Sequence, residues 1–136
     1  MEFVQSNIWL ILLAAVSGFM LIMPNLGATL RGIKEVGVLE ATQLINHRDA
    51  VVVDVREDKE WAASHVSQAR HIPLGQLSGR LKELEKFKNK PIVIICRSGH
   101  RSASACGTLK KNGFNEVFNL KGGIIAWEQA NMPVEK

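Results

Sequence analysis

The apolar positions of this chain form two kinds of pattern, continuous runs and helically spaced stripes. Residues 50–55 and 91–95 are runs dominated by Val and Ile, which is typical of strands buried on both faces of a sheet. Residues 77–87 instead place leucines three and four positions apart, which predicts a helix. Shorter patterns predict helices over 40–47, 57–63, 102–111 and 123–129, and strands over 71–72 and 116–120. This alternation favours an α/β fold whose parallel sheet has helices on both faces.

The front of the chain has a different pattern. No charged residue occurs from Phe3 to Leu30, and residues 8–23 are almost wholly apolar. Those residues as a helix reach about 24 Å, and a few more reach the hydrocarbon core of about 30 Å. We therefore expect a transmembrane anchor over residues 1–30, a linker over 31–37 and one folded domain over 38–134. A signal peptide would carry a positive n-region, whereas this segment offers only Glu2, and a core helix would not be apolar on every face.

The charges that flank this segment predict its orientation. Glu2 precedes it, and Arg31 and Lys34 follow it. The positive-inside rule then places a single-pass protein in the cytoplasmic (inner) membrane, with its folded domain on the cytoplasmic side. The two cysteines, Cys96 and Cys106, are too few for a disulfide framework, which agrees with a reducing compartment.

Composition adds limits to the possible functions. The chain has 136 residues, 46% of them hydrophobic and 22% charged, and a formal net charge of +4. That length holds one domain and a short extra segment. The positive charge is spread too evenly to favour nucleic acid, but it suits an anionic membrane face or an anionic substrate. No residues show metal-ligand spacing and no phosphate or dinucleotide loop is present, so we expect neither a metal nor a cofactor.

The most informative residues follow the second apolar run. Cys96 stands at the end of the strand predicted over 91–95, and the sequence continues Arg97-Ser98-Gly99-His100-Arg101-Ser102 into the helix. Backbone N–H groups of such a loop, together with the positive end of the helix, can hold an anion. Both favour a thiolate, so we expect the Cys96 pKa to be lowered and the sulfur to be nucleophilic. The alternative, an inert core cysteine, would not require a glycine and two arginines close by.

Each position of the loop has an expected role in binding the anion. Gly99 is expected to adopt a positive φ, which glycine adopts readily. Arg101 closes the cradle with a fixed charge, and Ser102 either caps the helix or donates to the bound sulfur. Arg97 and His100 are expected to face outward and to select the substrate. The Cys-x4-Arg spacing is shorter than the Cys-x5-Arg of cysteine-dependent phosphatases and leaves room for one extra sulfur rather than a tetrahedral phosphate.

The sequence resembles the rhodanese (sulfurtransferase) family over about residues 36–134. The resemblance lies in the Cys96 loop and in three further segments that occur in the family's order. These are Asp54-Val55-Arg56; Glu60-Trp61 with His65-Val66, Ala69 and Ile72-Pro73; and Val117, Leu120, Gly122-Gly123, Trp127 and Pro133. Ser64 and Gln68 stand where the family usually has glycine. The resemblance implies a five-stranded sheet with Cys96 at the carboxyl end of a central strand.

The same resemblance implies an activity that needs no cofactor. Sulfane sulfur would pass from thiosulfate or a persulfide donor to Cys96, and then to a thiophilic acceptor such as a small thiol or a protein cysteine. Two alternatives remain open: a persulfide carrier that serves a protein partner without turnover, and a phosphatase or arsenate reductase that uses the same loop.

Residues outside the loop receive structural roles. Asp54 and Arg56 are expected to form an ion pair or hydrogen bonds that support the loop, with direct substrate contact as the alternative. Cys106 is expected to be a small core residue, with a resolving thiol as the alternative. His65 and His71 are interpreted as structural residues. The tryptophans Trp61 and Trp127 are interpreted as core residues.

Overall fold

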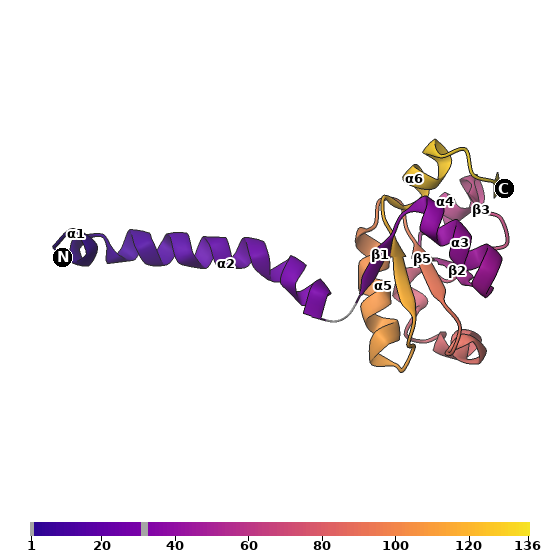
Figure 1. Cartoon of the computed structure of the whole chain (residues 1–136), viewed down its shortest axis with the longest axis horizontal. Helices are drawn as coiled ribbons and strands as arrows, with labels where there is room; N and C mark the ends of the chain where they lie inside the picture. Colours follow the sequence, from indigo (N-terminus) through magenta and orange to yellow (C-terminus); the bar gives the residue numbers. More distant parts are fainter. Residues whose placement is uncertain (1, 31–32) are drawn as a thin grey trace. The chain divides into compact units, whose positions relative to one another are not determined.

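The computed structural model describes the backbone of residues 2–30 and 33–136, and the side chains of the same residues except 21–30. The chain divides into two compact units, Met1–Gly32 and Ile33–Lys136. The second unit contains the whole sheet and every residue of the Cys96 loop (Figure 1).

The first unit consists of two helices, α1 (Glu2–Ser6) and α2 (Ile8–Leu30). The described apolar side chains of α2, such as Trp9 and Leu13, are exposed. The expected transmembrane anchor over residues 1–30 is not supported, because no helix among the described residues is long and apolar enough to cross a bilayer. The part of that anchor over residues 21–30, and linker residues 31 and 32, lie outside the described side chains.

The second unit is built on a parallel five-stranded sheet, as the sequence predicts. Its strand order is β1-β6-β5-β2-β4, and every neighbouring pair is parallel. The strands are β1 (Lys34–Val36), β2 (Val51–Asp54), β4 (Arg70–His71), β5 (Ile92–Ile95) and β6 (Val117–Leu120). β5 lies in the centre, so a residue that follows it reaches the middle of the carboxyl edge.

Strand β1 corrects the prediction of a linker over residues 31–37. It pairs with β6, and Lys121 N donates to the Val36 carbonyl at 2.8 Å. Only Val36 of its three residues is buried, so the strand is too short and too polar to show an apolar pattern in the sequence.

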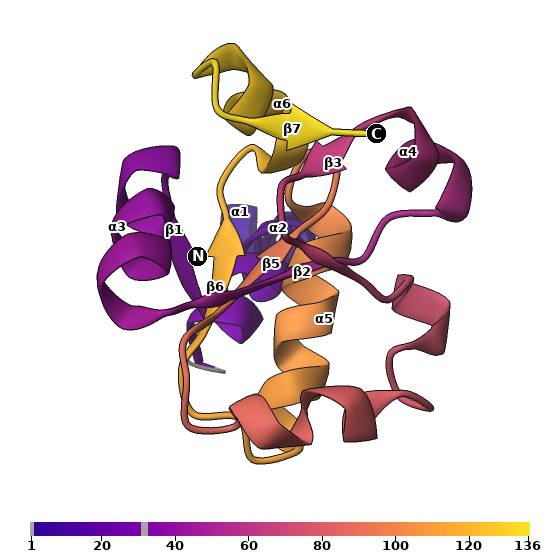
Figure 2. The same ribbon diagram turned by 90° about the vertical axis from the view of Figure 1, so that its right-hand side faces the viewer.

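Helices cover both faces of the sheet (Figure 2). α3 (Val38–Arg48) and α6 (Gly123–Gln129) belong to one face, and α5 (His100–Lys111) covers the other. Ile92 and Ile94 of β5 pack into the cluster beneath α5, whereas Val93 and Ile95 pack into the cluster on the α3 face. A strand with apolar contacts on both faces explains the unbroken run that the sequence shows.

In place of the helix predicted over 77–87, the structure has a turn at residues 77–79 and the 3₁₀ segment η2 (Leu81–Phe87), and a second 3₁₀ segment, η1 (Leu74–Gln76), precedes the turn. Leu77 and Leu84 are 1% and 0% exposed, so the leucines are buried as expected. A 3₁₀ helix repeats every three residues, so η2 turns Leu81 and Leu84 toward the same cluster, and Leu77 joins that cluster from the turn before η2.

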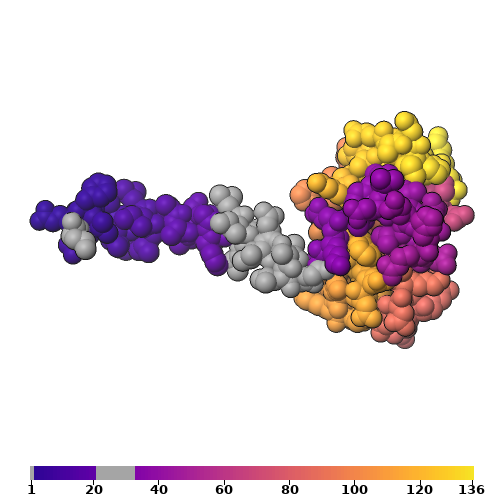
Figure 3. Space-filling view, in the orientation of Figure 1, coloured from indigo at the N-terminus to yellow at the C-terminus, as the bar shows by residue number. Residues whose placement is uncertain are grey.

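A second, two-stranded sheet was not predicted. β3 (His65–Val66) pairs antiparallel with β7 (Val134–Glu135), which brings the end of the chain beside the segment that follows α4 (Asp58–Ala63). Figure 3 shows the C-terminal residues next to α3 on one face of this unit. Strands of two residues give too few alternations to be recognised from the sequence.

Candidate active site

Cys96 occupies the position that the sequence predicts, directly after β5. Its side chain is 1% exposed. The N-cap of α5 is Gly99, whose φ of 111° lies in the left-handed region. Helix α5 begins at His100, two residues before its predicted start. Ser102 is therefore inside the first turn of the helix and is not its cap.

The sulfur of Cys96 receives hydrogen bonds from the loop. Gly99 N–H donates to Sγ at 2.9 Å, and the Ser102 hydroxyl lies 3.3 Å from Sγ. Burial raises the pKa of Cys96, but the Ser102 hydroxyl and the backbone N–H groups of Ser102, Gly99 and Ser98 outweigh it, so the pKa is lowered. Hydrogen bonds to the charged form stabilise a thiolate. The loop is therefore suited to hold a nucleophilic sulfur.

A buried asparagine on the neighbouring strand supports the loop. Asn119 of β6 is 3% exposed, accepts a hydrogen bond from the Ser102 hydroxyl and donates from Nδ2 to the Gly99 carbonyl at 3.0 Å. Asn119 was not among the residues predicted for the site. The sequence did contain an indication of this role, because Asn119 is the one polar side chain in the strand Val117–Leu120. A buried polar group needs a hydrogen-bond partner.

The pair of glycines before α6 lets the backbone approach the loop. Ile124 N donates to the Cys96 carbonyl at 2.9 Å, and Ile125 N lies 3.4 Å from the Arg97 carbonyl. Gly123 has a φ of 56°, and a Cβ at this position would lie 2.3 Å from the Cys96 carbonyl oxygen. Only glycine fits there, which gives a physical reason for a glycine at this position of the motif.

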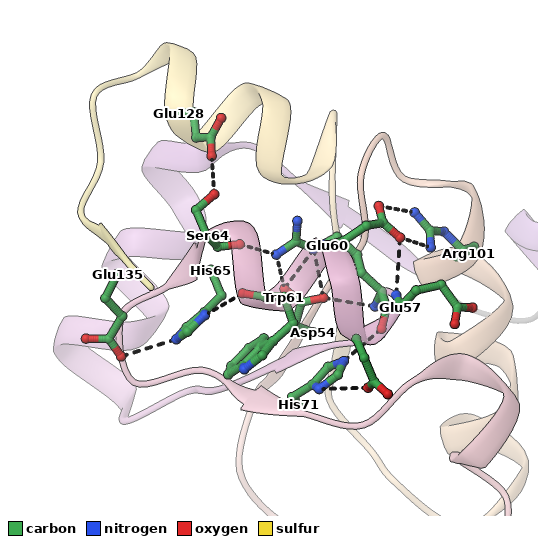
Figure 4. Close-up of polar contacts among 12 residues, drawn as sticks. Asp54, Glu57, Glu60, Trp61, Ser64, His65, His71, Arg101, Glu128 and Glu135 are labelled. Atoms are coloured by element: carbon green, nitrogen blue, oxygen red, sulfur yellow. Dashed lines mark hydrogen bonds and ion pairs between the residues drawn. The ribbon is translucent and has the colours of Figure 1, made fainter.

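Arg101 forms an ion pair with a carboxylate that the sequence analysis did not assign. Its Nη1 and Nη2 donate to Glu60 Oε1 and Oε2 at 2.6 and 2.9 Å (Figure 4). The hydrogen bond from Arg101 is the main reason that the pKa of Glu60 falls to about 2. The positive charge expected to face the substrate is therefore shared with Glu60. An anion in the loop meets an Arg101 that is already partly neutralised.

Asp54 and Arg56 form a buried ion pair. Arg56 Nε donates to both carboxylate oxygens of Asp54 at 3.0 and 2.9 Å, and Arg56 Nη2 donates to the Ser64 carbonyl at 2.6 Å. Within the described residues 33–136, no hydrogen bond joins this pair to residues 97–102. The pair instead holds the end of α4, and α4 carries Glu60. Its support thus reaches the loop indirectly, through the contact between Glu60 and Arg101 (Figure 4).

The two histidines of this region pack on either side of a tryptophan. The Trp61 ring lies 3.6 Å from the His65 ring and 4.7 Å from the His71 ring, with interplanar angles of 4° and 8°. His65 Nδ1 also contacts the Trp61 carbonyl at 2.9 Å, and His71 Nε2 contacts the Arg56 carbonyl at 2.8 Å. These contacts fit a structural role, because they attach α4 to β3, which contains His65, and to β4, which contains His71.

The remaining predicted residues lie in two environments. Arg97, Ser98 and His100 are exposed at the loop surface, where they can meet a substrate. Cys106 and Trp127 are buried, and burial raises the pKa of Cys106 to about 12. Both cysteines are free. Over the part of the chain that the structure describes, no group of three His, Cys, Asp or Glu side chains is placed to bind a metal ion.

Comparison with known proteins agrees with this architecture. The family model for the rhodanese-like domain matches residues 38–130. The chain belongs to the rhodanese-like domain family. A crystal structure of a rhodanese-related protein from Thermoplasma volcanium is similar, with a TM-score of 0.67 and 30% identity over 75% of this chain and 97% of that one.

Several curated proteins are similar in sequence. A sulfurtransferase of Allochromatium vinosum is 37% identical over 68% of this chain and 84% of its own length. The thiosulfate sulfurtransferase GlpE of Coxiella burnetii is 33% identical over 70% and 87%. The uncharacterized protein YqhL of Bacillus subtilis is 43% identical over 60% of this chain, and the match spans 63% of YqhL.

Proposed function

We propose that this protein is a sulfurtransferase that carries sulfane sulfur as a persulfide on Cys96. The observation that carries the proposal is the environment of the sulfur, which is buried and accepts the Gly99 N–H at 2.9 Å, with a lowered pKa. Membership of the rhodanese-like domain family and similarity to proteins named sulfurtransferase support the same reaction. Thiosulfate or a persulfide is the proposed donor.

The proposed reaction has two half-reactions. The Cys96 thiolate attacks the outer sulfur of thiosulfate, a new S–S bond forms, and the old S–S bond breaks with its electron pair leaving on sulfite. The product is the Cys96 persulfide anion. A nucleophilic acceptor such as cyanide or a thiolate then attacks the terminal sulfur, and the electron pair returns to Cys96. Covalent catalysis of this kind predicts ping-pong kinetics.

The loop supplies the stabilisation that each step needs. Backbone N–H groups fixed by Gly99 and by the first turn of α5 point at the sulfur before any donor arrives, and preorganised donors need no rearrangement when the charge moves. Arg101 adds a positive charge that Glu60 partly neutralises. This shared charge and the Cys-x4-Arg spacing both favour one extra sulfur over a doubly charged phosphate group.

Steady-state kinetics test the proposal. The whole chain would be assayed for thiocyanate formation while thiosulfate and cyanide are varied together, with Cys96→Ser as the inactive variant and Cys106→Ala as the matched control. We expect parallel double-reciprocal lines for the wild type and Cys106→Ala, and no turnover for Cys96→Ser. Equal thiocyanate formation by Cys96→Ser would refute the proposal. Loading without turnover would favour a carrier that delivers sulfur to a protein partner.

The location of the protein is a separate proposal that the sequence alone supports. We propose that the uncharged segment from Phe3 to Leu30 holds the chain at the cytoplasmic membrane, with Arg31, Lys34 and the folded domain on the cytoplasmic side. Membrane fractions washed at alkaline pH should retain the whole chain, and a chain without residues 3–30 should be released. Recovery of the whole chain in the soluble fraction would contradict this proposal.

A further inference from the structure

The Ser102 hydroxyl lies between two buried groups that both accept hydrogen bonds. Its Oγ is 3.3 Å from Cys96 Sγ, and it donates to Asn119 Oδ1. A serine hydroxyl carries a single proton, so it can donate to only one of these acceptors at a time. The choice between them must therefore depend on the charge of the Cys96 sulfur.

The orientation of the Asn119 amide is fixed by its second hydrogen bond. Asn119 Nδ2 donates to the Gly99 carbonyl at 3.0 Å. The reversed amide would place Oδ1 against the Gly99 carbonyl oxygen, so that two acceptors would face each other. Oδ1 therefore faces Ser102. Because Asn119 is 3% exposed, solvent is not available to replace the Ser102 hydroxyl as its donor.

We propose that Asn119 is a positioning residue that holds the Ser102 proton whenever the Cys96 sulfur is uncharged, and so favours the thiol and the persulfide over the bare thiolate. The part of this inference that concerns the persulfide rests on the proposed sulfurtransferase function. The part that concerns the thiol rests on the hydrogen bonds alone.

The Ser102 proton is directed to Asn119 in the thiol and in the persulfide, and to the sulfur in the thiolate. In the thiol, S–H donates to Ser102, and Ser102 donates to Asn119, so that every group is paired. In the thiolate, Ser102 turns toward the sulfur and leaves the buried Asn119 Oδ1 without a donor, which is unfavourable. In the persulfide the charge lies on the outer sulfur. The inner sulfur is then a weak acceptor, and Ser102 returns to Asn119.

Other titratable groups also act on this sulfur. Arg101 and Cys106 of α5 interact with the charge of Cys96, and Glu60 of α4 pairs with Arg101. All three stay unchanged in the variants that test Asn119. The pKa change in Asn119→Leu, which adds no charge, therefore reports the hydrogen bonds of Asn119, whereas Asn119→Asp also adds a charge of its own.

The test measures the pKa of Cys96 on the whole chain from the pH dependence of its alkylation rate, with peptide masses to separate Cys96 from Cys106. Asn119→Leu should lower the pKa by about one unit, because Ser102 no longer has a competing acceptor. The near-isosteric Asn119→Asp should raise it, because a carboxylate holds the proton more strongly and repels a thiolate. In a Ser102→Ala background, Asn119→Leu should cause no further decrease.

Two results would overturn the inference. If Leu and Asp at position 119 both raise the pKa, or if Leu lowers it equally without the Ser102 hydroxyl, then Asn119 acts only by holding Gly99. Asn119→Leu is the deciding variant, and Asn119→Ala, which also lacks the acceptor and should lower the pKa in the same way, replaces it if the leucine variant does not fold.

Equilibrium loading from glutathione persulfide tests the second half of the inference. At a pH above the Cys96 pKa, where the empty site is a thiolate, the equilibrium constant for loading should fall about tenfold in Asn119→Leu, the equivalent of one pKa unit, and an unchanged constant at that pH would contradict this half. If the wild type does not load at all, the proposed function fails. The alkylation result still decides the first half, because it needs no sulfur donor.

Discussion

Two cysteines of this protein lie in the same apolar cluster and differ in almost every chemical respect. Cys96 and Cys106 are 1% and 0% exposed, and both belong to the core beneath α5. The pKa of Cys96 is lowered, whereas burial raises the pKa of Cys106 to about 12. Burial acts in the same direction on both. The difference comes from donors, because Cys96 receives the Gly99 N–H and faces the Ser102 hydroxyl.

The comparison shows that depth in a core does not decide whether a cysteine is reactive. A buried thiol becomes nucleophilic where hydrogen-bond donors face the sulfur, and at Cys96 these are the Ser102 hydroxyl and the backbone N–H groups of the loop. At Cys96 the chain turns because a left-handed Gly99 ends the loop and Gly123 lets α6 pack closely against it. Cys106, within the regular α5, has no such turn beside it.

The largest expected difference is in activity, between a variant that lacks the Cys96 thiol and one that lacks the Cys106 thiol. Cys96→Ser should abolish thiocyanate formation, because a serine hydroxyl cannot carry the sulfur. Cys106→Ala should keep full activity and lose about 1 kcal/mol of stability through the small cavity it leaves. Denaturant unfolding and the steady-state assay measure both effects. A loss of activity in Cys106→Ala, with its fold intact, would make Cys106 a resolving thiol rather than a core residue.

Gly123→Ala should damage the Cys96 environment and leave that of Cys106 intact. The new Cβ would overlap the carbonyl oxygens of Cys96 and Arg97, at 2.3 and 2.5 Å, and the alanine would also hold an unfavourable φ of 56°. We expect at least a tenfold loss of activity and about 2 kcal/mol of destabilisation. Gly37→Ala is the matched control, because a Cβ there meets nothing within 4 Å. Full activity in Gly123→Ala would show that α6 does not shape the loop.

Ser102→Ala should make Cys96 less reactive, and in this respect more like Cys106. The hydroxyl is the largest of the contacts that lower the Cys96 pKa, so its removal should raise that pKa. The reaction rate at neutral pH should then fall about tenfold, because fewer molecules carry the thiolate. The alkylation rate as a function of pH checks this, and the rate at high pH should approach that of the wild type. An unchanged pKa would mean that the backbone N–H groups alone set it.

Glu60→Gln should have the smallest effect, and that effect should depend on pH. The folded-state pKa of Glu60 is lowered to about 2 from an ordinary value of 4.5. Its ion pair with Arg101 therefore stabilises the protein above about pH 4.5, and that contribution is lost as the pH falls toward 2. We expect the variant to lose about 1–2 kcal/mol at neutral pH, since solvent screens a partly exposed pair, and much less near pH 2. Urea unfolding at several pH values measures the difference, and an equal loss at every pH would contradict it.

The same variant tests how Arg101 selects substrates. Without Glu60, the guanidinium keeps its full charge beside the loop. We expect the KM for the doubly charged thiosulfate to fall in Glu60→Gln, with a smaller change for a singly charged persulfide. Equal changes for both donors would show that Glu60 only supports the loop.

The sequence predicted the elements that carry continuous patterns. The runs at 50–55 and 91–95 became β2 and β5, because strands covered on both faces are apolar at nearly every position, Asp54 at the end of β2 being the exception. Gly99 was predicted to adopt a positive φ, and it does. The short strands β1, β3 and β7 were missed, because two or three residues cannot establish a period. The equally short β4 was predicted within one residue, beside the Pro73 that follows it.

The contacts of the site that were not predicted from the sequence were missed for one physical reason. Asn119 reaches Ser102 across 17 residues of sequence, and Glu60 reaches Arg101 across 41. Such pairs form only when the sheet and α4 bring distant segments together, and no local pattern encodes them. The roles of Asp54 and Arg56 changed for the same reason, since their contacts lead to Ser64 and not directly to the loop.

The most direct test of the central claim is the intact mass of the whole chain after incubation with thiosulfate. The account predicts a gain of about 32 Da, one sulfur, on the wild type and on Cys106→Ala, which a thiol reductant then removes. It predicts no gain on Cys96→Ser, and peptide masses should place the extra sulfur on Cys96. An extra sulfur on Cys106, or an equal gain on Cys96→Ser, would contradict the account.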